Sequence, residues 1–476
     1  MKESKGLYLL KNISYLTIGQ LATKVLMFIL LPLYTSILSP EEYGIFDLYI
    51  STVTLLMPIF TFNISEAVLR FSVDVDDNDN VFTNGLKIIL LSCCFCILFL
   101  AINNICGFFP LIQKHEYIFF IMYIFTVLLE VIVNFARGID KIACVAISGF
   151  VGSTITILFN IFFLVFLKYK LNGFFIAYIL GLMGQIIYLG FSFRIFRYIN
   201  LCKAKPKELI EMLRYSIPLI WNSLAWWLND VSSRYIITFF LGVYETGIYS
   251  AATRIPAILA ILQSIFNKAW VVSAIKDFES NESVQFFSNV YKIYNAFMVV
   301  ICSILILANK FIAYMLFSGN FYEAWKYSPF LLLSLVFSAL SGFLGGIFAA
   351  KKATGVYSYS STIGAIINVF FCFFLITKIG TLGASIAALL SSVVIWGFRY
   401  YCVQKYIKLK ANHRNNTIAY LLLLIQVYIM IYVDKNIILY TTQIIILSLI
   451  CVVYRGVFIS IIKISKDKFK RKGLPI

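Results

Sequence analysis

Apolar stretches long enough to cross a lipid bilayer recur along the whole chain, and they constrain the fold more than any other feature. A helix needs about 20 apolar residues to span the hydrocarbon core. Inside lipid every backbone polar group must be hydrogen-bonded within the protein, and runs of this length favour helices. Of the 476 residues, 61% are hydrophobic and 13% are charged, which is too little polar surface for a soluble protein. The sequence therefore predicts an all-α polytopic membrane protein.

The apolar stretches predict about fourteen transmembrane helices. They are residues 13–38, 44–70, 85–109, 117–136, 142–167, 172–193, 213–241, 244–270, 286–308, 327–350, 356–377, 380–401, 417–433 and 437–462. The first stretch follows the basic segment 1–11 and lacks a small-residue cleavage site, so we expect a retained helix rather than a signal peptide.

The net charge of +18 would suit a nucleic-acid-binding protein, but the basic residues lie mainly in alternate loops and in the C-terminal tail. These are Arg194, Arg197, Lys203, Lys205, Lys207, Arg214, Arg399, Lys405, Lys408, Lys410, Arg414, Lys463, Lys466, Lys468, Lys470, Arg471 and Lys472. Positive charge on one side marks the cytoplasmic face of a membrane protein. We therefore expect both termini in the cytoplasm, an even number of spans, and no nucleic acid as a partner.

No metal or cofactor motif emerges from the sequence. The ten cysteines have no zinc or haem spacing and read as small buried apolar residues. The acidic segment "DVDDNDN" at 74–80 contains Asp-Val-Asp, a weak match to a metal and nucleotide-sugar motif. A solvated turn is the simpler interpretation and a metal site the alternative, so we expect no cofactor.

Two halves of the chain resemble each other at a separation of about 203 to 210 residues. "LSPEEYGIF" at 38–46 resembles "LGVYETGIY" at 241–249, and "FN" recurs at 62–63 and 266–267. "STITILFNIFFLVFL" at 153–167 resembles "STIGAIINVFFCFFL" at 361–375. In the first pair we expect a helix end, a short acidic loop and a new helix. In the second pair Asn160 matches Asn368, and further on Gly173 and Ala177 match Gly383 and Ala387.

This separation spans six predicted helices, an even number, so the halves have the same orientation in the membrane. Parallel repeats of this kind are typical of transporters, with the substrate path between the halves. We expect a six-helix lobe at 1–200, a second at 201–408, and two additional helices with a basic tail at 409–476.

Four cations in matching helices of the two halves predict a positive cavity. Lys24 lies roughly 18 Å into the first span and Arg254 roughly 15 Å into the eighth, both near the midplane. Arg70 lies at the inner end of the second span and Arg234 toward the outer part of the seventh. Embedded charges cost roughly 2.5–3.5 kcal/mol on insertion scales and usually face a cavity or a partner. Such a cavity would suit an anion, phosphate above all; the alternative is that each cation pairs with a nearby acid or snorkels to a membrane interface.

The stretch "WNSLAWWLNDVSSRYIITFF" at 221–240 places polar groups in an apolar helix. Asp230 and Arg234 are four residues apart and can pair on one face of the helix. That ion pair could hold the helix to a neighbour; alternatively Arg234 lines the cavity and Asp230 tunes it. Asn222 and Asn229 share a face and could bind sugar hydroxyls or join helices.

Two further acids, Glu66 and Glu130, lie in predicted spans. Glu66 has Arg70 four residues later, which favours a local pair. Glu130 has no cation within one turn, so it is a candidate site for coupling to a proton or sodium gradient; otherwise it is protonated or bonded across helices.

Two segments resemble a known family. "YLLKNISYLTIGQLATKVLMFILLPLYTSILSPEEYGIFDLY" resembles the N-terminus of bacterial polysaccharide repeat-unit flippases of the Wzx type. "LNDVSSRYIITFFLGVYETGIYSAATRI" resembles their helix 7 to helix 8 segment. These proteins belong to the multidrug/oligosaccharidyl-lipid/polysaccharide exporter (MOP) superfamily, and the resemblance covers essentially the whole chain.

The resemblance implies two six-helix bundles, a bacterial plasma membrane, and an undecaprenyl-diphosphate-linked oligosaccharide as cargo. It also implies O-antigen or capsule assembly beside a polymerase and a chain-length regulator. A multidrug transporter would favour acidic walls, whereas here embedded cations outnumber embedded acids. A lipid II flippase is a closer alternative, because its cargo also carries a diphosphate. A polymerase usually needs a large outer loop, and an acyltransferase needs a buried histidine, so we do not expect an enzyme.

Overall fold

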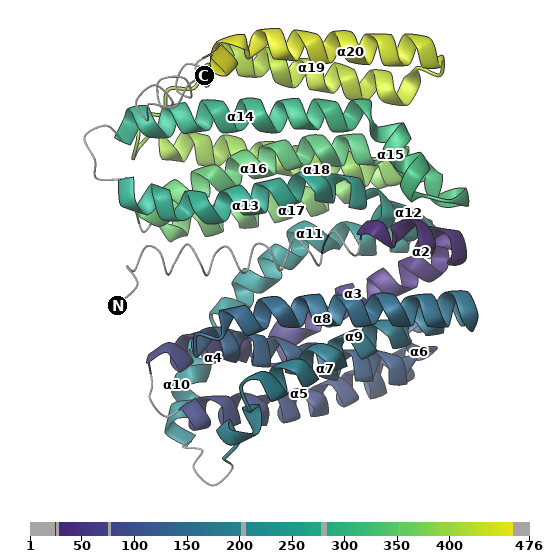
Figure 1. Cartoon of the computed structure of the whole chain (residues 1–476), viewed down its shortest axis with the longest axis vertical. Helices are drawn as coiled ribbons and strands as arrows, with labels where there is room; N and C mark the ends of the chain where they lie inside the picture. The colour runs from purple at the N-terminus through teal and green to yellow at the C-terminus, as the bar shows by residue number, and fades with distance from the viewer. Residues whose placement is uncertain are drawn as a thin grey trace, which may run out of the picture. The chain divides into compact units, whose positions relative to one another are not determined.

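The computed structural model describes Lys24 and residues 28–74, 78–200, 206–277, 283–351 and 353–459. Helices make up most of this part of the chain, and it contains no strand (Figure 1). The predicted all-α class is therefore confirmed. The chain forms two compact units, Met1–Gly247 and Ile248–Ile476. The predicted lobe boundaries, 1–200, 201–408 and 409–476, stay a prediction.

The first unit is built from helices, and several of them are long enough to cross a membrane. They are α2 (Leu31–Ile37), α3 (Pro40–Phe60), α4 (Ile64–Asp74), α5 (Asn78–Cys106), α6 (Pro110–Gln113), α7 (Glu116–Gly138), α8 (Ile142–Asn160), the π-helix η1 (Ile161–Phe166), α9 (Lys170–Ser192), the 3₁₀ helix η2 (Ile195–Tyr198), α10 (Pro206–Ser216) and α11 (Leu219–Leu241). Helix α12 (Val243–Ala252) crosses the boundary between the units.

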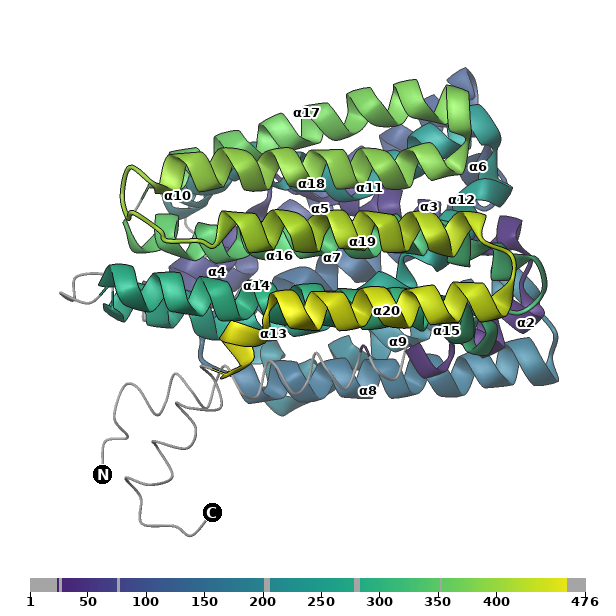
Figure 2. The same cartoon turned by 90° about the horizontal axis from the view of Figure 1, so that it is seen from above.

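The second unit is built from long helices, with shorter ones between α14 and α16. They are α13 (Arg254–Asp277), α14 (Ser283–Leu307), α15 (Asn309–Leu316), η3 (Gly319–Lys326), α16 (Ser328–Ala350), α17 (Thr354–Ile379), α18 (Thr381–Val403), α19 (His413–Tyr432) and α20 (Asn436–Val453). Helices α17 and α18 pack closely, and α19 and α20 form a neighbouring pair beside α14 (Figure 2). Helix α16 lies at the core, with buried residues along its whole length.

Twelve helices within the described ranges are long and apolar enough to cross a membrane. The first predicted span, 13–38, lies largely outside those ranges. The seventh, 213–241, is largely occupied by α11, which is not among the twelve. Its polar residues, Asn222, Asn229, Asp230 and Arg234, lower its mean hydropathy. Helices α19 and α20 occupy the last two predicted spans.

One predicted span, 44–70, is not a single helix. Helix α3 ends at Phe60, and α4 begins at Ile64. Between them Phe62 and Asn63 adopt left-handed backbone conformations, with φ of 52° and 54°. Asparagine tolerates this region, whereas a bulky residue such as phenylalanine rarely adopts it. The Asn63 amide donates from Nδ2 to Ser223 Oγ of α11 at 3.3 Å, which ties the break to a neighbouring helix.

Two other predicted spans are interrupted next to prolines. The span 213–241 is divided into α10 and α11 near Pro218, and the span 244–270 into α12 and α13 at Thr253. Pro256 stands four residues after Ala252, the last residue of α12. A proline ring clashes with the carbonyl four residues before it and donates no N–H to it. The proline side chains therefore explain both interruptions.

The acidic residues in the first repeated segment belong to helices and not to a loop as expected. Glu41 and Glu42 lie in the first turn of α3, and Glu245 lies in the first turn of α12. Ser39 and Glu42 form a capping box, in which each side chain bonds to the backbone of the other residue. Acidic side chains are stabilised at a helix N-terminus, where backbone N–H groups lack partners.

The repeated positions of the later segment are buried alike in the two units. Asn160 in α8 and Asn368 in α17 are both fully buried, as are Ala177 and Ala387. Gly173 lies in the first turn of α9, close to the turn before that helix. Gly383 lies in the first turn of α18, close to the backbone of Leu375. The "FN" pair does not repeat in this way, since Asn63 lies in a helix break whereas Asn267 lies inside α13.

Two matched glycines of the first repeated segment contact each other's helix. A Cβ atom on Gly44 of α3 would lie 2.5 Å from the carbonyl oxygen of Val243. A Cβ atom on Gly247 of α12 would overlap the carbonyl oxygen of Pro40. The two contacts are reciprocal, because Pro40 matches Val243 in the repeat. Only glycine allows the two backbones to approach this closely.

We predict that Gly247→Ala destabilises the protein, because overpacking costs about 1–3 kcal/mol. The measurement is the thermal unfolding midpoint of the purified protein in detergent. Gly397→Ala is the matched control, since Gly397 also lies within a helix but a Cβ atom there meets nothing within 4 Å. Alanine should be neutral or favourable at that position. Equal midpoints for the two variants would contradict the close approach.

Candidate functional site

Arg234 of α11 forms an ion pair with Asp47 of α3, a residue that the sequence analysis did not single out. Arg234 Nε lies 2.5 Å from Asp47 Oδ2, and the two side chains are 17% and 12% exposed. Arg234 also donates from Nη1 to the backbone carbonyl of Asp230 at 2.9 Å. The guanidinium charge is therefore balanced across two helices.

Hydrogen bonds between α3 and α11 surround this pair, and we call them the polar seam. Thr52 Oγ1 lies 2.6 Å from Tyr235 Oη, and Trp227 donates from Nε1 to the carbonyl of Ser51 at 2.9 Å. Each hydrogen bond made inside a membrane protein satisfies a group that lipid could not. The seam therefore holds α11 on α3 and fixes the position of the Arg234 side chain.

The ion pair expected between Asp230 and Arg234 does not form, because Arg234 pairs with Asp47. Asp230 is exposed on α11 and interacts with Arg234 only at longer range. Asn229 lies beside the Asp230 carboxylate. Asn222 is exposed nearer the start of the same helix. Asp230 and the two asparagines thus remain candidates for contact with a ligand.

Glu130 of α7 is connected to a cation more than one turn away, because Asn134 and Arg137 follow four and seven residues later on the same face of the helix. Asn134 donates from Nδ2 to Glu130 Oε1 at 3.2 Å, and Arg137 donates from Nη1 to Asn134 Oδ1 at 3.1 Å. Glu66 of α4 lies within electrostatic range of Glu130. The structure therefore brings the two embedded acids Glu66 and Glu130 within electrostatic range of each other, with Asn134 and Arg137 connected to Glu130.

The other predicted cations are placed individually. Arg70 and Glu66 are both exposed on α4. Lys24, in the first unit, has helical backbone conformation and is also exposed. Arg254 belongs to the second unit, where it is the first residue of α13 and follows the break at Thr253. Arg254 is thus at a helix end and not within a continuous helix as expected.

Arg399 was expected at a loop, but it is buried within α18 and 3% exposed. It donates to the hydroxyls of Ser360 and Ser361 at 2.8 Å, and to the carbonyls of Ser341 and Tyr357 at 3.0 and 3.3 Å. Its guanidinium lies 4.0 Å from the centre of the Tyr357 ring. Within the described part of the chain no carboxylate pairs with it, so hydroxyls, carbonyls and a ring stabilise the charge.

We predict that Asp47→Asn and Arg234→Gln are coupled, with a double-mutant interaction of about 0.5–3 kcal/mol. Each single change leaves a partly buried group without its partner, so the double variant should lose less stability than the sum of the two. Unfolding midpoints in detergent measure this.

The exposed pair of Lys326 and Glu323 is the matched control for that cycle, with side chains 45% and 56% exposed. Exposed pairs contribute about 0.2–1 kcal/mol, so Lys326→Gln and Glu323→Gln should be nearly additive. Additive losses at Asp47 and Arg234 would mean that the pair does not stabilise the helix contact.

Known proteins resemble this chain in fold. It superposes on the lipid II flippase MurJ in an inward closed conformation with a TM-score of 0.70 and 14% identity, covering 93% of this chain and 99% of that one. An inward-facing multidrug resistance transporter of the MATE family superposes with a TM-score of 0.66 and 14% identity, covering 88% of this chain and 96% of that one. A MOP superfamily transporter from Pyrococcus furiosus superposes with a TM-score of 0.59 and 16% identity, covering 90% of this chain and 99% of that one. A search of curated protein sequences gives no match.

The sequence itself matches one family model. That model is described as a polysaccharide biosynthesis protein, and it matches residues 9–272, which is more than half of the chain. The matched range contains the ion pair between Asp47 and Arg234 and the cluster around Glu130. This multi-span membrane protein therefore belongs to the polysaccharide biosynthesis protein family and has a fold similar to that of MATE transporters and a lipid II flippase.

Proposed function

We propose that the protein is a flippase for an undecaprenyl-diphosphate-linked oligosaccharide repeat unit. It would move this cargo from the cytoplasmic to the outer leaflet of a bacterial plasma membrane, for assembly of O-antigen or capsule by a polymerase and a chain-length regulator. The observation that carries the proposal is membership in a polysaccharide biosynthesis family by a chain built of spanning helices. Such a protein meets saccharides as lipid-linked intermediates.

The embedded cations support an anionic attachment point on the cargo. In this proposal Lys24, Arg70, Arg234 and Arg254 receive the diphosphate, because guanidinium groups bind phosphate oxygens in a bidentate manner. Arg234 would exchange the Asp47 carboxylate for phosphate oxygens when cargo enters and return to Asp47 when cargo leaves. An exchange of partners avoids leaving a cation unpaired in the membrane at either stage.

The polar residues of α11 would contact the sugar. Asn222 and Asn229 carry amides that can both donate to and accept from hydroxyl groups. Transport would proceed by alternating access. Glu66 and Glu130, which lie within electrostatic range of each other, are the candidates for holding a proton or sodium ion, with Asp230 as a third.

A lipid II flippase is the second candidate, because the chain superposes on MurJ over 93% of its length. Its cargo also carries a diphosphate, so the same cations would serve. A multidrug transporter is less well supported, since a cationic drug would be repelled by the same residues.

Depletion of the protein in its native host tests the proposal. We expect complete lipid-linked repeat units to accumulate on the cytoplasmic leaflet, measured by extraction, sizing and leaflet-specific labelling of undecaprenyl-linked glycans. Arg254→Ala and Arg234→Ala should reproduce the accumulation, because each removes a charge that would bind the diphosphate. The expected excess is about tenfold or more, corresponding to about 1.4 kcal/mol per lost contact.

Lys378→Ala, at an exposed position in the last turn of α17, is the matched control and should transport normally at equal protein level. Complete units on the outer leaflet would indicate a polymerase and overturn the proposal. Accumulation of the peptidoglycan precursor instead would favour lipid II, and altered drug sensitivity without any lipid accumulation would favour a multidrug substrate.

A further inference from the structure

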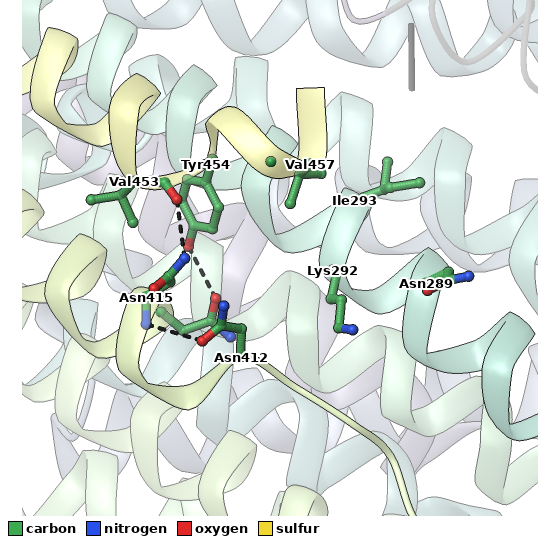
Figure 3. A pocket seen from close by; sticks show the side chains of 10 residues that line it. Asn289, Lys292, Ile293, Asn412, Asn415, Val453, Tyr454 and Val457 are labelled. Carbon is green, nitrogen blue, oxygen red and sulfur yellow. Dashed lines mark hydrogen bonds between the residues drawn. The ribbon is translucent and has the colours of Figure 1, made fainter. Parts of the chain in front are cut away.

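A cavity of about 350 Å³ lies inside the second unit, where the ends of α14, α19 and α20 meet (Figure 3). Its polar wall consists of Asn289 and Lys292 of α14, Asn412, Asn415 and Asn416 at the start of α19, and Tyr454 after α20. None of these residues was singled out in the sequence, and none belongs to the proposed cargo site.

Several hydrogen-bond donors of this wall remain available. Asn415 donates to the carbonyl of Val453 at 3.1 Å, and the Tyr454 hydroxyl donates to Asn416 Oδ1 at 3.3 Å. Asn416 is only 7% exposed, yet its amide nitrogen has no partner among the residues that the structure describes. Lys292 and Asn289 likewise have none there. Three residues that line the cavity therefore carry donor groups that have no described partner, and one of these side chains is buried.

The charge of the wall favours an anion. Lys292 contributes a full positive charge, and no acidic residue is among the described residues that line the cavity. The N-terminus of α19, a helix of 20 residues, adds a partial positive charge, although Asn412 already caps the N–H of Asn415. A cation combined with amide donors binds the oxygens of phosphate, which accept several hydrogen bonds at once.

The surroundings of the cavity indicate where this phosphate comes from. The wall joins three helices of membrane-spanning length, and apolar side chains of two of them, such as Val452 of α20 and Leu421 of α19, are 58% and 53% exposed. Lys408 and Lys410 precede α19, and Arg414 lies in its first turn. These residues belong to one of the loops predicted to be cytoplasmic. Basic pockets between transmembrane helices on that side bind anionic lipid headgroups.

We propose that this cavity binds the phosphate headgroup of an anionic membrane lipid from the leaflet at the predicted cytoplasmic side. The volume fits a headgroup, so the acyl chains lie outside along the apolar faces of α19 and α20. The site is separate from the residues of the proposed function and does not depend on it.

Unfolding of the purified full chain in a neutral detergent tests the site, with lipid added as mixed micelles. Phosphatidylglycerol should raise the unfolding midpoint, whereas phosphatidylcholine should not. Lys292→Gln should raise the phosphatidylglycerol concentration for half the effect about fivefold, since one basic residue contributes about this factor. Asn289→Ala should weaken the response in the same direction, and because Asn289 is exposed its replacement leaves the fold intact.

Lys207→Gln is the matched control, because it removes one exposed lysine of the predicted cytoplasmic surface outside the cavity. It should respond as the unchanged protein does. The proposal is overturned if Lys292→Gln and Lys207→Gln respond alike, or if phosphatidylcholine stabilises equally well. It is also overturned if inorganic phosphate alone gives the full shift and abolishes the response to lipid, since the ligand would then be a soluble anion.

Discussion

A polar or charged side chain inside an apolar helix must find its partner within the protein, and much of the described structure follows from this constraint. The two arginines that α11 and α18 carry meet it in different ways. Arg234 uses a carboxylate, Asp47, on a neighbouring helix. Arg399 uses neutral groups only, two hydroxyls and two carbonyls among them. In the proposed function the first arrangement exchanges its carboxylate for another anion, whereas in the second four hydrogen bonds and a ring enclose the cation.

The same constraint extends to the amides. Asn160 donates to the Tyr34 hydroxyl at 2.9 Å, and Gln426 and Gln443 donate to the carbonyls of Ser303 and Gln426. Each contact joins two helices that apolar packing alone would leave free to slide. Lipid tails are as apolar as leucine, so hydrogen bonds and close backbone contacts contribute more to specificity here than in a soluble protein.

The positions of the spans could be predicted from sequence, because the thickness of the bilayer sets the length of each apolar run. The helix breaks could be predicted only in part. Pro218 and Pro256 mark two of them, but Pro58 lies inside α3 without ending it, and the left-handed turn at Phe62 and Asn63 has no local signal. A proline therefore favours an interruption of a membrane helix, as at Pro218 and Pro256, but does not impose one at Pro58.

The candidate site was predicted less completely, for a related reason. Spacing along one helix identifies Asp230 as a partner for Arg234, whereas the partner used is Asp47, which is distant in the sequence and near in the fold. Glu130 was predicted to have no cation within one turn; Arg137 lies two turns along the same helix and is reached through Asn134, which that one-turn window did not include. Local patterns name the charged residues; only the tertiary structure assigns them to one another.

The burial of Arg399 has a consequence for the biogenesis of the protein. While α18 inserts, its neighbours are not yet packed, and on the predicted topology a cation near its end would favour retention of that end on the cytoplasmic side. After assembly the same side chain is enclosed by α16 and α17. Lysine would preserve the first role but not the second, because an ammonium lacks the planar set of five donors. An arginine at this position would thus suit both insertion and helix assembly.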